Sequence, residues 1–502
     1  MTFDSLRHFA LGEPAPENDH AVCISLPTMA DVIGYEEKQP AVMSKIRSGY
    51  PRFVIHKYID RLIKELLEEM NLSGEAGFAI RTESGARELL EYLNSPSFKI
   101  QQGEDFILVH GPDTKEYRSL GKHFLQHTGL SISSRQAEDS LIRRNILKKK
   151  PEESQNEEPE TFAKETLADA IGSEVLPDDV ILANSGANAF YALFQASKNL
   201  LAKRGRKIWV QLGWLYVDTI KVLEKFSGGD TKIIAIRKVE DLTMLQKLFE
   251  EKGKEIAAVV TETPTNPLIQ TCDLEEVRNL CRNSGAMLIV DPTMSSPLNV
   301  KVAGHADVIV NSLTKYAANE GDVMLGCLAF PKGSPFREEL LESTRSRIAP
   351  PYQRDLDRLA FEMKDYVKMV ERTNENTAKL AQFLASHQAV SKVNWAYSEP
   401  FRKNYEQLAG SERPGCMLAF ETKGPIKRFY DKVRLLKSPS FGTKFTLLCP
   451  YVYLAHYESL QHEDGLIELA EAGLEPELIR VSVGMEPTDQ IIEVFEEALN
   501  LS

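Results

Sequence analysis

This sequence has few cysteines and no long apolar run. Its six cysteines are scattered among 502 residues, without a CxxC pair or a zinc-type spacing. We therefore expect reduced, buried thiols, and, because the ten histidines include no HExxH motif, no metal site. No apolar run approaches the roughly 20 residues that cross a bilayer, which argues against a transmembrane helix.

Positive charge is also in short supply. The chain has 60 Lys and Arg residues against 73 Asp and Glu, a net charge of −13. Neither nucleic acid nor an anionic membrane is expected as a partner of such a chain. The N-terminus lacks the basic-then-apolar order of a signal peptide, so we expect a cytoplasmic protein. No GxGxxG follows a strand-like segment, which argues against a nicotinamide-dependent enzyme.

The chain is too long for one hydrophobic core, and its patterns divide it into three parts. Residues 1–135 form an N-terminal extension, with a helical pattern over 59–70 and a strand-like run at 106–110. Residues 136–365 alternate strand-like and helical segments, which predicts an α/β domain with a mostly parallel sheet. Residues 366–502 mix strands and helices and predict a smaller α+β domain.

Finer features of these parts can also be predicted. The strand-like runs of the central domain are 207–212, 232–236, 256–261, 287–290 and 306–310. Residues 148–165 are rich in lysines, acids and prolines, which favours a mobile surface loop. A long amphipathic helix is expected over 361–386, and Asp273 is expected to cap a helix that runs to about residue 283.

Ionisable side chains stand at the ends of two predicted strands. Asp291 ends the run 287–290, and Lys315 follows the run 306–310 between hydroxyl residues. In an open α/β sheet, ligands bind beyond the carboxyl ends of the strands. A lysine can bond an aldehyde and an acid can keep a pyridine nitrogen protonated, so the pair suits pyridoxal phosphate (PLP). Taken alone, Lys315 fits a solvated surface lysine better.

Further candidates follow other predicted strands. Ser185, Gly186 and Ala187 begin a predicted helix, whose N–H groups could hold a phosphate or could be simply capped by the serine. Tyr216 could stack on a flat ring or belong to the core. Asn266 lies in a loop that two prolines make rigid, where its amide could bond an oxygen or merely shape a turn.

Arg480 lies inside a short apolar strand, residues 478–484. A partly buried arginine needs an anionic partner. That partner is either a carboxylate of the protein or the carboxylate of an amino-acid substrate, and the sequence leaves both open.

In their order along the chain, these motifs resemble those of the Cys/Met-metabolism family of PLP enzymes of fold type I, which includes cystathionine γ-synthase. The central signatures are ETPTNP (262–267), VDPT (290–293) and NSLTKY (311–316). The C-terminal matches are GCMLAFE (415–421) and IRVSVGMEP (479–487). Two N-terminal stretches, SGYPRF (48–53) and QHTGLSISSRQAE (126–138), resemble the fungal branch of cystathionine γ-synthase-like proteins.

The resemblance implies PLP as the cofactor and a role for each motif around its ring. Lys315 would form the Schiff base, and Asp291 would pair with the pyridine nitrogen. Thr293 would lie beside the ring, Tyr216 would stack on its face, and Asn266 would bond its hydroxyl oxygen. Lys315, Tyr216 and Asp291 would therefore be the catalytic residues.

The phosphate and the substrate would be held by other groups. The phosphate ligands implied by the resemblance are Ser185, Gly186, Ala187, Ser312 and Thr314. Arg480, assisted by Ser440, would hold the carboxylate of an amino-acid substrate. Family members build each site from two chains, a neighbour lending a Tyr-x-Arg pair to the phosphate, so a homodimer is the expected minimal unit and a homotetramer is expected.

Two positions depart from the family pattern. The Tyr-x-Arg segment reads Ser133-Ser134-Arg135, so Arg135 is kept as a phosphate ligand but the tyrosine is absent. Ala187 takes the place of a methionine, which predicts a slightly wider cofactor cradle.

The activity that the resemblance implies is γ-replacement on an O-acyl-L-homoserine, with L-cysteine as the default nucleophilic co-substrate. The alternative is an enzyme of specialised metabolism that joins a carbon nucleophile, a β-keto acid or ester, to Cγ. A γ-lyase is a further reading. A cofactor-free structural or regulatory protein is disfavoured, because Lys315, Asp291 and Arg480 are all present in register.

Overall fold

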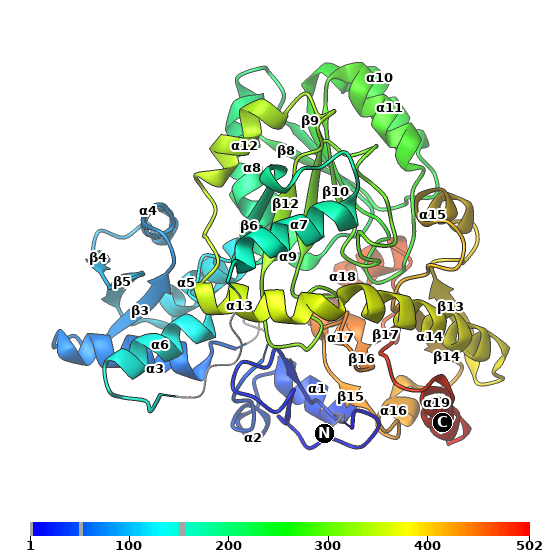
Figure 1. Ribbon diagram of the computed structural model, residues 1–502, viewed down its shortest axis with the longest axis horizontal. Coiled ribbons are helices and arrows are strands. Elements are labelled where there is room, and N and C mark those ends of the chain that lie inside the picture. The colour runs from blue at the N-terminus through cyan, green and yellow to red at the C-terminus, as the bar shows by residue number, and fades with distance from the viewer. Residues whose placement is uncertain (1–3, 50–53, 150–156, 502) are drawn as a thin grey trace.

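The computed structural model describes residues 4–49, 54–149 and 157–501 (Figure 1). Residues 50–53, the greater part of the SGYPRF motif, and residues 150–156 of the expected loop lie outside the described residues. Of the four sheets among the described residues, three are packed with helices: a small N-terminal one, a central one and a C-terminal one (Figure 1).

A seven-stranded sheet forms the centre of the molecule. Its strands, in spatial order, are β6 (Val180–Ala183), β12 (Gly326–Ala329), β11 (Val308–Ser312), β10 (Met287–Asp291), β9 (Ile256–Glu262), β7 (Ile208–Leu212) and β8 (Lys232–Ile236). Strand β12 is antiparallel to both neighbours, whereas β11, β10, β9, β7 and β8 pair in parallel. The predicted α/β fold with a mostly parallel sheet is confirmed.

The central strands form because they are short, continuous apolar runs. All residues of β7 and β9 are buried, which requires cover on both faces of the sheet. Helix α8 (Gly186–Ala202) packs on β11 and β12, and α11 (Leu274–Ser284) packs on β9 and β10. Asp273 caps α11 as expected, its side chain accepting from the Glu276 N–H. The other helices here are α7 (Pro159–Ile171), α9 (Val217–Phe226), α10 (Thr243–Lys252) and α12 (Arg337–Arg345).

Two expected boundaries are wrong. The loop was expected over 148–165, but α7 already begins at Pro159. Proline suits the first turn of a helix, and the helix is then stabilised by burial of Ala163 and Leu167. The helix expected over 361–386 is divided into α13 (Gln353–Glu362), a 3₁₀ turn and α14 (Tyr366–Ser386). Both helices are amphipathic, so the periodicity runs through the turn that separates them.

A five-stranded sheet lies in the C-terminal part. Its strands, in order, are β13 (Val390–Trp395), β14 (Met417–Thr422), β17 (Ile479–Ser482), β16 (Leu447–Pro450) and β15 (Leu436–Lys437), and only β15 and β16 pair in parallel. Helix α14 packs on β13, β14 and α19 (Thr488–Asn500). Shorter helices complete this part: α15 (Arg402–Ala409), α16 (Ile426–Tyr430), α17 (Tyr451–Ala455) and α18 (Glu463–Glu471).

The N-terminal layer is a three-stranded antiparallel sheet with four helices. Its elements are α3 (Lys57–Glu69), β3 (Glu75–Ile80), α4 (Glu83–Leu93), β4 (Lys99–Gln102), β5 (Ile107–Pro112), α5 (Lys115–Thr128) and α6 (Ser134–Arg143). The helix expected at 59–70 and the strand expected at 106–110 correspond to α3 and β5. The boundary expected at residue 135 falls inside α6, which packs on α3.

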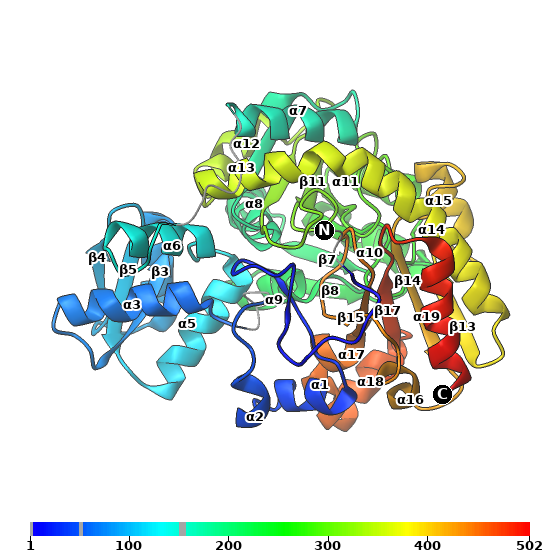
Figure 2. The same ribbon diagram turned by 60° about the horizontal axis from the view of Figure 1, so that its bottom comes forward.

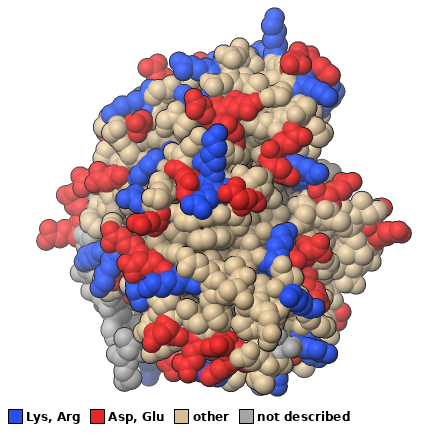
Figure 3. All heavy atoms as spheres, turned by 90° about the vertical axis from the view of Figure 1, so that its right-hand side faces the viewer, with Lys and Arg blue, Asp and Glu red and all other residues tan. Residues whose placement is uncertain are grey.

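The residues before this layer join it to the C-terminal sheet. They contain β1 (Pro14–Ala15), β2 (Cys23–Ile24), α1 (Met29–Glu36) and α2 (Pro40–Met43). The Val22 N–H donates to the Gly321 carbonyl and the Leu26 N–H to the Lys437 carbonyl. Figure 2 shows this dark blue segment lying beside β15 and α17. On the face shown in Figure 3, acidic and basic side chains are interspersed, without a broad patch of one sign.

Candidate active site

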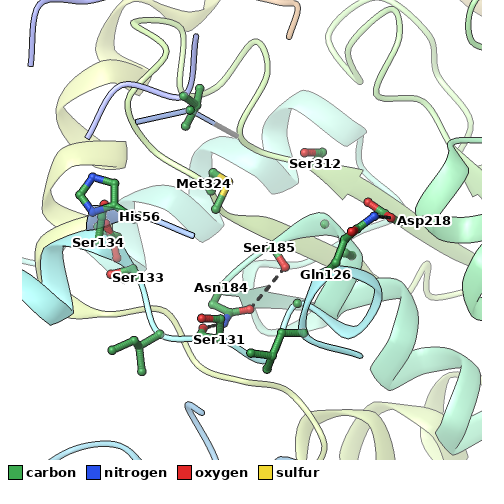
Figure 4. A pocket seen from close by; sticks show the side chains of 18 of the residues that line it. His56, Gln126, Ser131, Ser133, Ser134, Asn184, Ser185, Asp218, Ser312 and Met324 are labelled. Atoms are coloured by element: carbon green, nitrogen blue, oxygen red, sulfur yellow. Dashed lines mark hydrogen bonds between the residues drawn. The ribbon is translucent and has the colours of Figure 1, made fainter. Parts of the chain in front are cut away.

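A cavity of about 210 Å³ lies where the carboxyl ends of β9, β10 and β11 meet the N-terminus of α8. The predicted residues in its wall are Arg135, Ser185, Gly186, Ala187, Tyr216, Asn266, Asp291, Thr293, Ser312 and Lys315. Figure 4 shows Ser185 and Ser312 beside this cavity, with Ser131 and Ser133 of the N-terminal layer also in its wall. A smaller hollow of about 40 Å³ adds Ser440 and Arg480, and shares Tyr216, Asn266 and Lys315 with the larger one.

Lys315 lies just after β11, with only 7% of its surface exposed. Its Nζ lies 3.3 Å from Ser440 Oγ, to which it donates, and 4.8 Å from the centre of the Phe441 ring. Burial, followed by the nearby Arg480 guanidinium, lowers the pKa of the Lys315 amine to about 7. Lys315 is therefore largely a neutral nucleophile at pH values where an exposed lysine is a cation.

Asp291 ends β10 beside a second acid, Glu262, which ends β9. The two are direct partners in the parallel ladder. Burial raises the pKa of Asp291 to about 6, although the Thr293 hydroxyl and N–H both oppose the rise. Burial and then the Asp291 charge raise the pKa of Glu262 well above its ordinary value. A cationic ring nitrogen beside Asp291 would compensate its charge, which is the task that the sequence predicts for this side chain.

Thr293 ties the two strand ends together. Its N–H donates to Asp291 Oδ1 at 2.8 Å, and its hydroxyl donates to Asn311 Oδ1 at 3.0 Å. The Ser312 N–H in turn donates to the Thr293 hydroxyl at 2.9 Å. The carboxylate on β10 and the serine on β11 are thus fixed relative to each other.

The N-terminus of α8 forms a cradle that fits a phosphate. Ser185 caps the helix by accepting from the Asn188 N–H, and Gly186 and Ala187 form its first turn. A Cβ on Gly326 of β12 would lie 2.4 Å from the Gly186 nitrogen, so this close approach requires glycine. The first N–H groups of a helix are available to an anion, and here they lie in the cavity wall with Ser312.

Tyr216 and Asn266 are both anchored by Glu262. The Tyr216 N–H donates to Glu262 Oε1, and the Asn266 N–H donates to Glu262 Oε2 at 3.2 Å. Glu262 was not among the residues predicted for the site, although it begins the ETPTNP signature. Its importance comes from strand register, which brings it beside Asp291 and which the motif alone does not reveal.

Arg480 on β17 reaches across to the central sheet. Its Nη1 donates to Asn266 Oδ1 at 2.9 Å, and its Nη2 donates to the carbonyls of Pro439 and Ser440. Its guanidinium carbon lies 5.2 Å from the ring centres of both Phe441 and Tyr451. The sequence left open whether the partner of Arg480 is a carboxylate of the protein or of a substrate. The contacts that the structure shows are with amide and backbone oxygens rather than with a protein carboxylate. These two aromatic residues were missed by the sequence analysis, because nothing in their spacing marks them.

Arg135 lines the cavity of its own chain. Its guanidinium is 1% exposed, donates to the Asp322 carbonyl at 2.7 Å, and pairs with the carboxylates of Asp322 and Asp355. Among the described residues that were predicted for the site, Thr314 alone lines neither the cavity nor the smaller hollow. Its hydroxyl donates to the Leu325 carbonyl at 3.2 Å.

Other site types find no support in the described residues. The six cysteines are all buried. Within residues 4–49, 54–149 and 157–501, no group of three His, Cys, Asp or Glu residues could hold a metal ion. The same ranges contain no helix with the length and apolarity needed to span a membrane.

Comparison with known proteins agrees with this geometry. The chain is 33% identical over 489 residues to the L-2-amino-4-chloropent-4-enoate dechlorinase/desaturase of Streptantibioticus cattleyicolor, with 97% of both chains covered. It is 27% identical over 618 residues to cystathionine gamma-synthase of Neurospora crassa, with 98% of both covered. The structure of cystathionine gamma synthase from Xanthomonas oryzae pv. oryzae, in complex with aminoacrylate and cysteine, has the same fold. It covers 69% of this chain and 86% of its own, with a TM-score of 0.57 and 20% identity.

A family model also matches most of the chain. The model of the family described as Cys/Met metabolism PLP-dependent enzyme matches residues 161–500, which include the whole central sheet and the C-terminal sheet. The chain therefore belongs to the Cys/Met metabolism family of PLP-dependent enzymes.

Proposed function

We propose that this protein catalyses γ-replacement on an O-acyl-L-homoserine. The observation that carries the proposal is the buried Lys315 amine, which lies between the cradle at α8 and the Arg480 hollow and whose pKa is lowered to about 7. A base that must take protons from substrate carbons is best placed there, since it is neutral near physiological pH.

The cavity residues fit PLP at each of its functional groups. Ser185, Gly186, Ala187 and Ser312 would hold the phosphate, and Asp291 would hold the ring nitrogen as a cation. When bound, PLP supplies an electron sink that makes the substrate's Cα and Cβ protons removable. Tyr216 and Asn266, which Glu262 fixes, line the cavity on the side of Arg480.

The reaction steps follow from where the protein's own groups lie. Arg480, with Ser440, orients the substrate carboxylate beside Lys315. Lys315 accepts the proton from Cα, gives it up again, and as a neutral amine then accepts the proton from Cβ. Tyr216 delivers a proton toward the departing oxygen at Cγ. The aromatic rings of Phe441 and Tyr451 beside Arg480 limit water at the substrate carboxylate.

The identity of the acceptor is the finer part of the proposal. L-Cysteine, which would give cystathionine, is the default that the family suggests. The alternative is a carbon nucleophile, a β-keto acid or ester. A third outcome, loss of the γ-substituent with no acceptor, is supported by the name of the Streptantibioticus relative, a dechlorinase/desaturase.

Product masses distinguish these outcomes. The PLP-loaded enzyme is incubated with O-acetyl- or O-succinyl-L-homoserine, and with L-cysteine, a β-keto ester or no acceptor. A γ-substituted amino acid together with free carboxylate supports replacement. Carboxylate release accompanied only by an unsaturated or keto product supports elimination. No carboxylate release from either substrate would contradict the proposal.

A homo-oligomer with a homodimer as its smallest active unit is part of the proposal, and a tetramer of two dimers is its fuller form. It rests on the family pattern, in which a neighbour lends the arginine at position 135. In the structure Arg135 lies in the cavity wall of its own chain. Recovery of activity on mixing Arg135→Ala chains with Lys315→Ala chains would support sharing. No recovery, with the Arg135→Ala chains shown to be folded by circular dichroism, would assign Arg135 to its own site.

A further inference from the structure

The Arg480 hollow is bounded by two walls that come from different sheets. One wall contains Tyr216 and Val217 at the start of α9, which follows β7 of the central sheet. The other wall contains residues of α17, which follows β16 of the C-terminal sheet: Tyr451, Leu454 and Ala455. The hollow measures only about 40 Å³. Whatever holds the two walls at a fixed separation therefore decides what fits between them.

A hydrogen bond joins these two walls. Trp214 precedes Tyr216 by two residues, and His456 directly follows Ala455. The Trp214 indole N–H donates to His456 Nε2 at 3.1 Å, and the two ring centres lie 4.9 Å apart in an edge-to-face arrangement. Neither side chain lines the hollow. The bond therefore connects the walls without occupying the space between them.

The chemistry of this pair makes the bond hard to replace. An indole N–H can only donate, so His456 Nε2 must accept and the imidazole in this pair is neutral. Trp214 is only 5% exposed. A buried N–H that loses its acceptor costs free energy until the structure moves to satisfy it. Loss of the His456 acceptor would therefore favour a displacement of one wall relative to the other.

Contacts continue from this pair to the arginine of the hollow. The ring centre of His456 lies 5.7 Å from that of Tyr451. The Tyr451 ring centre in turn lies 5.2 Å from the guanidinium carbon of Arg480. A displacement of α17 would therefore also move the aromatic face beside which the Arg480 guanidinium lies.

An ion pair provides a second connection between the same parts of the molecule. Arg237 follows β8, and its guanidinium carbon lies 4.7 Å from the ring centre of Trp214. The same guanidinium pairs with Glu468 of α18, whose side chain is partly exposed. Partly exposed ion pairs contribute little to stability. The Trp214–His456 bond is therefore the stronger of these two connections.

We propose that Trp214 and His456 are positioning residues for the amino-acid substrate, because their hydrogen bond holds α17 against the start of α9 and so fixes the width of the Arg480 hollow. The inference rests on the proposed function, in which this hollow receives the substrate carboxylate. The two side chains act through Tyr216, Tyr451 and Arg480 and not by touching the substrate.

Three variants separate the hydrogen bond from the bulk of the side chains. Trp214→Phe keeps an aromatic ring but lacks the N–H, and His456→Leu lacks the acceptor. His456→Gln keeps an acceptor at about the distance of Nε2 along the side chain. In the first two variants, KM for O-acetyl-L-homoserine should rise about 2- to 10-fold, the effect of one hydrogen bond. The rise should exceed any fall in kcat, and His456→Gln should largely restore KM.

The double variant Trp214→Phe/His456→Leu tests whether the two single effects have one cause. Both substitutions break the same bond, so KM in the double variant should be no higher than in the more affected single variant. The visible absorbance of bound PLP, measured first in each variant, should stay at the wild-type level and shows that the chain is folded and loaded.

Hydrogen exchange gives a readout that does not depend on turnover. The His456 N–H donates to the Val452 carbonyl, so backbone amides of residues 451–456 report the stability of α17. Their exchange should be faster in Trp214→Phe and His456→Leu than in the wild type, and close to the wild type in His456→Gln.

Tyr457→Phe is the matched control. It removes another side-chain hydrogen bond from the same segment, the one that the Tyr457 hydroxyl donates to Glu37 Oε1 at 2.9 Å. That bond is exposed, and neither partner lines the hollow. Tyr457→Phe should therefore leave both KM and the exchange of residues 451–456 unchanged.

Acetate release by the wild type separates failure of this inference from failure of the proposed function. If the wild type releases acetate but Trp214→Phe and His456→Leu keep the wild-type KM, the positioning inference is wrong and γ-replacement stands. Additive effects in the double variant would likewise assign the rise in KM to lost packing and overturn the inference. Absence of acetate release by the wild type would refute the proposed function, and the inference would fall with it.

Discussion

At the scale of single residues, burial sets the charge of the groups that do the chemistry. Lys315 and Asp291 are ordinary ionisable side chains whose pKa values move toward neutrality because water is excluded from around them. Burial favours the neutral form of both groups, although Asp291, with a pKa of about 6, is still mostly ionised at neutral pH. A cofactor that reacts with a neutral amine and carries a ring cation suits both groups.

The first prediction concerns the pH dependence of cofactor loading. The neutral form of Lys315 is the one that attacks an aldehyde, and its lowered pKa of about 7 makes that form dominant above neutrality. The rate at which apo-protein gains the visible absorbance of bound PLP should rise through pH 7 and then level off. A rate that keeps climbing toward pH 10 would show an ordinary, solvated lysine. Lys315→Ala should gain no such absorbance.

The second prediction concerns Arg480. Arg480→Lys keeps the positive charge but loses the planar fork that binds Asn266 and backbone oxygens and that we propose binds the substrate carboxylate. We expect kcat/KM for the amino-acid substrate to fall about 10- to 100-fold, mainly through KM, because a charge-assisted hydrogen bond is lost. Cofactor absorbance should persist. The control is Arg434→Lys, because Arg434 forms an exposed ion pair with Glu497 and lines neither hollow of the site. An unchanged KM in Arg480→Lys would remove the arginine from substrate binding.

At the scale of elements, the site exists because parallel strands end at one edge. The apolar runs predicted one strand that ends at Asp291 and another that ends just before the loop of Lys315. The carboxyl ends of parallel strands lie at the same edge of a sheet, so these two ends were predicted to lie close together. Register could not be predicted from the same pattern, and it is register that places Glu262 beside Asp291. Helix caps could also be predicted, as Asp273 and Ser185 show. A capping side-chain oxygen bonds to a backbone N–H a few residues further along the same chain, so it depends only on local sequence.

The third prediction tests the contact between α8 and β12. In Gly326→Ala the new Cβ would lie 2.4 Å from the Gly186 nitrogen, so the helix start must shift away from the phosphate cradle. We expect weaker PLP binding and a loss of about 1–3 kcal/mol in the free energy of unfolding, the usual cost of overpacking. Both are measured by PLP titration and chemical denaturation. Gly333→Ala, where no atom lies within 4 Å of the added Cβ, is the control and should change neither.

At the scale of the whole molecule, the cavity is a joint product of three layers that are distant in sequence. The central sheet supplies Lys315 and Asp291, the C-terminal sheet supplies Arg480, and the N-terminal layer supplies Arg135 and apolar side chains of α3, β3 and α5. The resemblance anticipated the first two contributions residue by residue, and it also anticipated Arg135. The apolar side chains depend on how α3, β3 and α5 dock, which is a tertiary contact with no motif of its own.

The fourth prediction tests that docking through Arg135. Burial of Asp322 is outweighed by Arg135 and Arg358, which hold the pKa of its carboxyl at about 2. Because this pKa is depressed, the stabilisation is present above the unfolded pKa of about 3.9 and is lost as pH falls toward 2. Arg135→Met removes the arginine that pairs with buried Asp355 and leaves Asp322 with Arg358, so it should cost about 3–5 kcal/mol at neutral pH.

Arg143→Ala is the matched control for this variant. Arg143 lies on the same helix, α6, but its pair with Glu104 is largely exposed. Such a pair contributes about 0–1 kcal/mol, so its loss should barely change the unfolding midpoint. Equal destabilisation by the two substitutions would mean that Arg135 does not hold the N-terminal layer in place.

The identity of the lysine that carries the cofactor tests the central claim most directly. The PLP-loaded protein is reduced with borohydride, digested, and analysed by mass spectrometry for a peptide that carries the reduced cofactor. We predict a single modified site at Lys315. Modification at another lysine, or none with Lys315 intact, would contradict the assignment of this cavity as the active site.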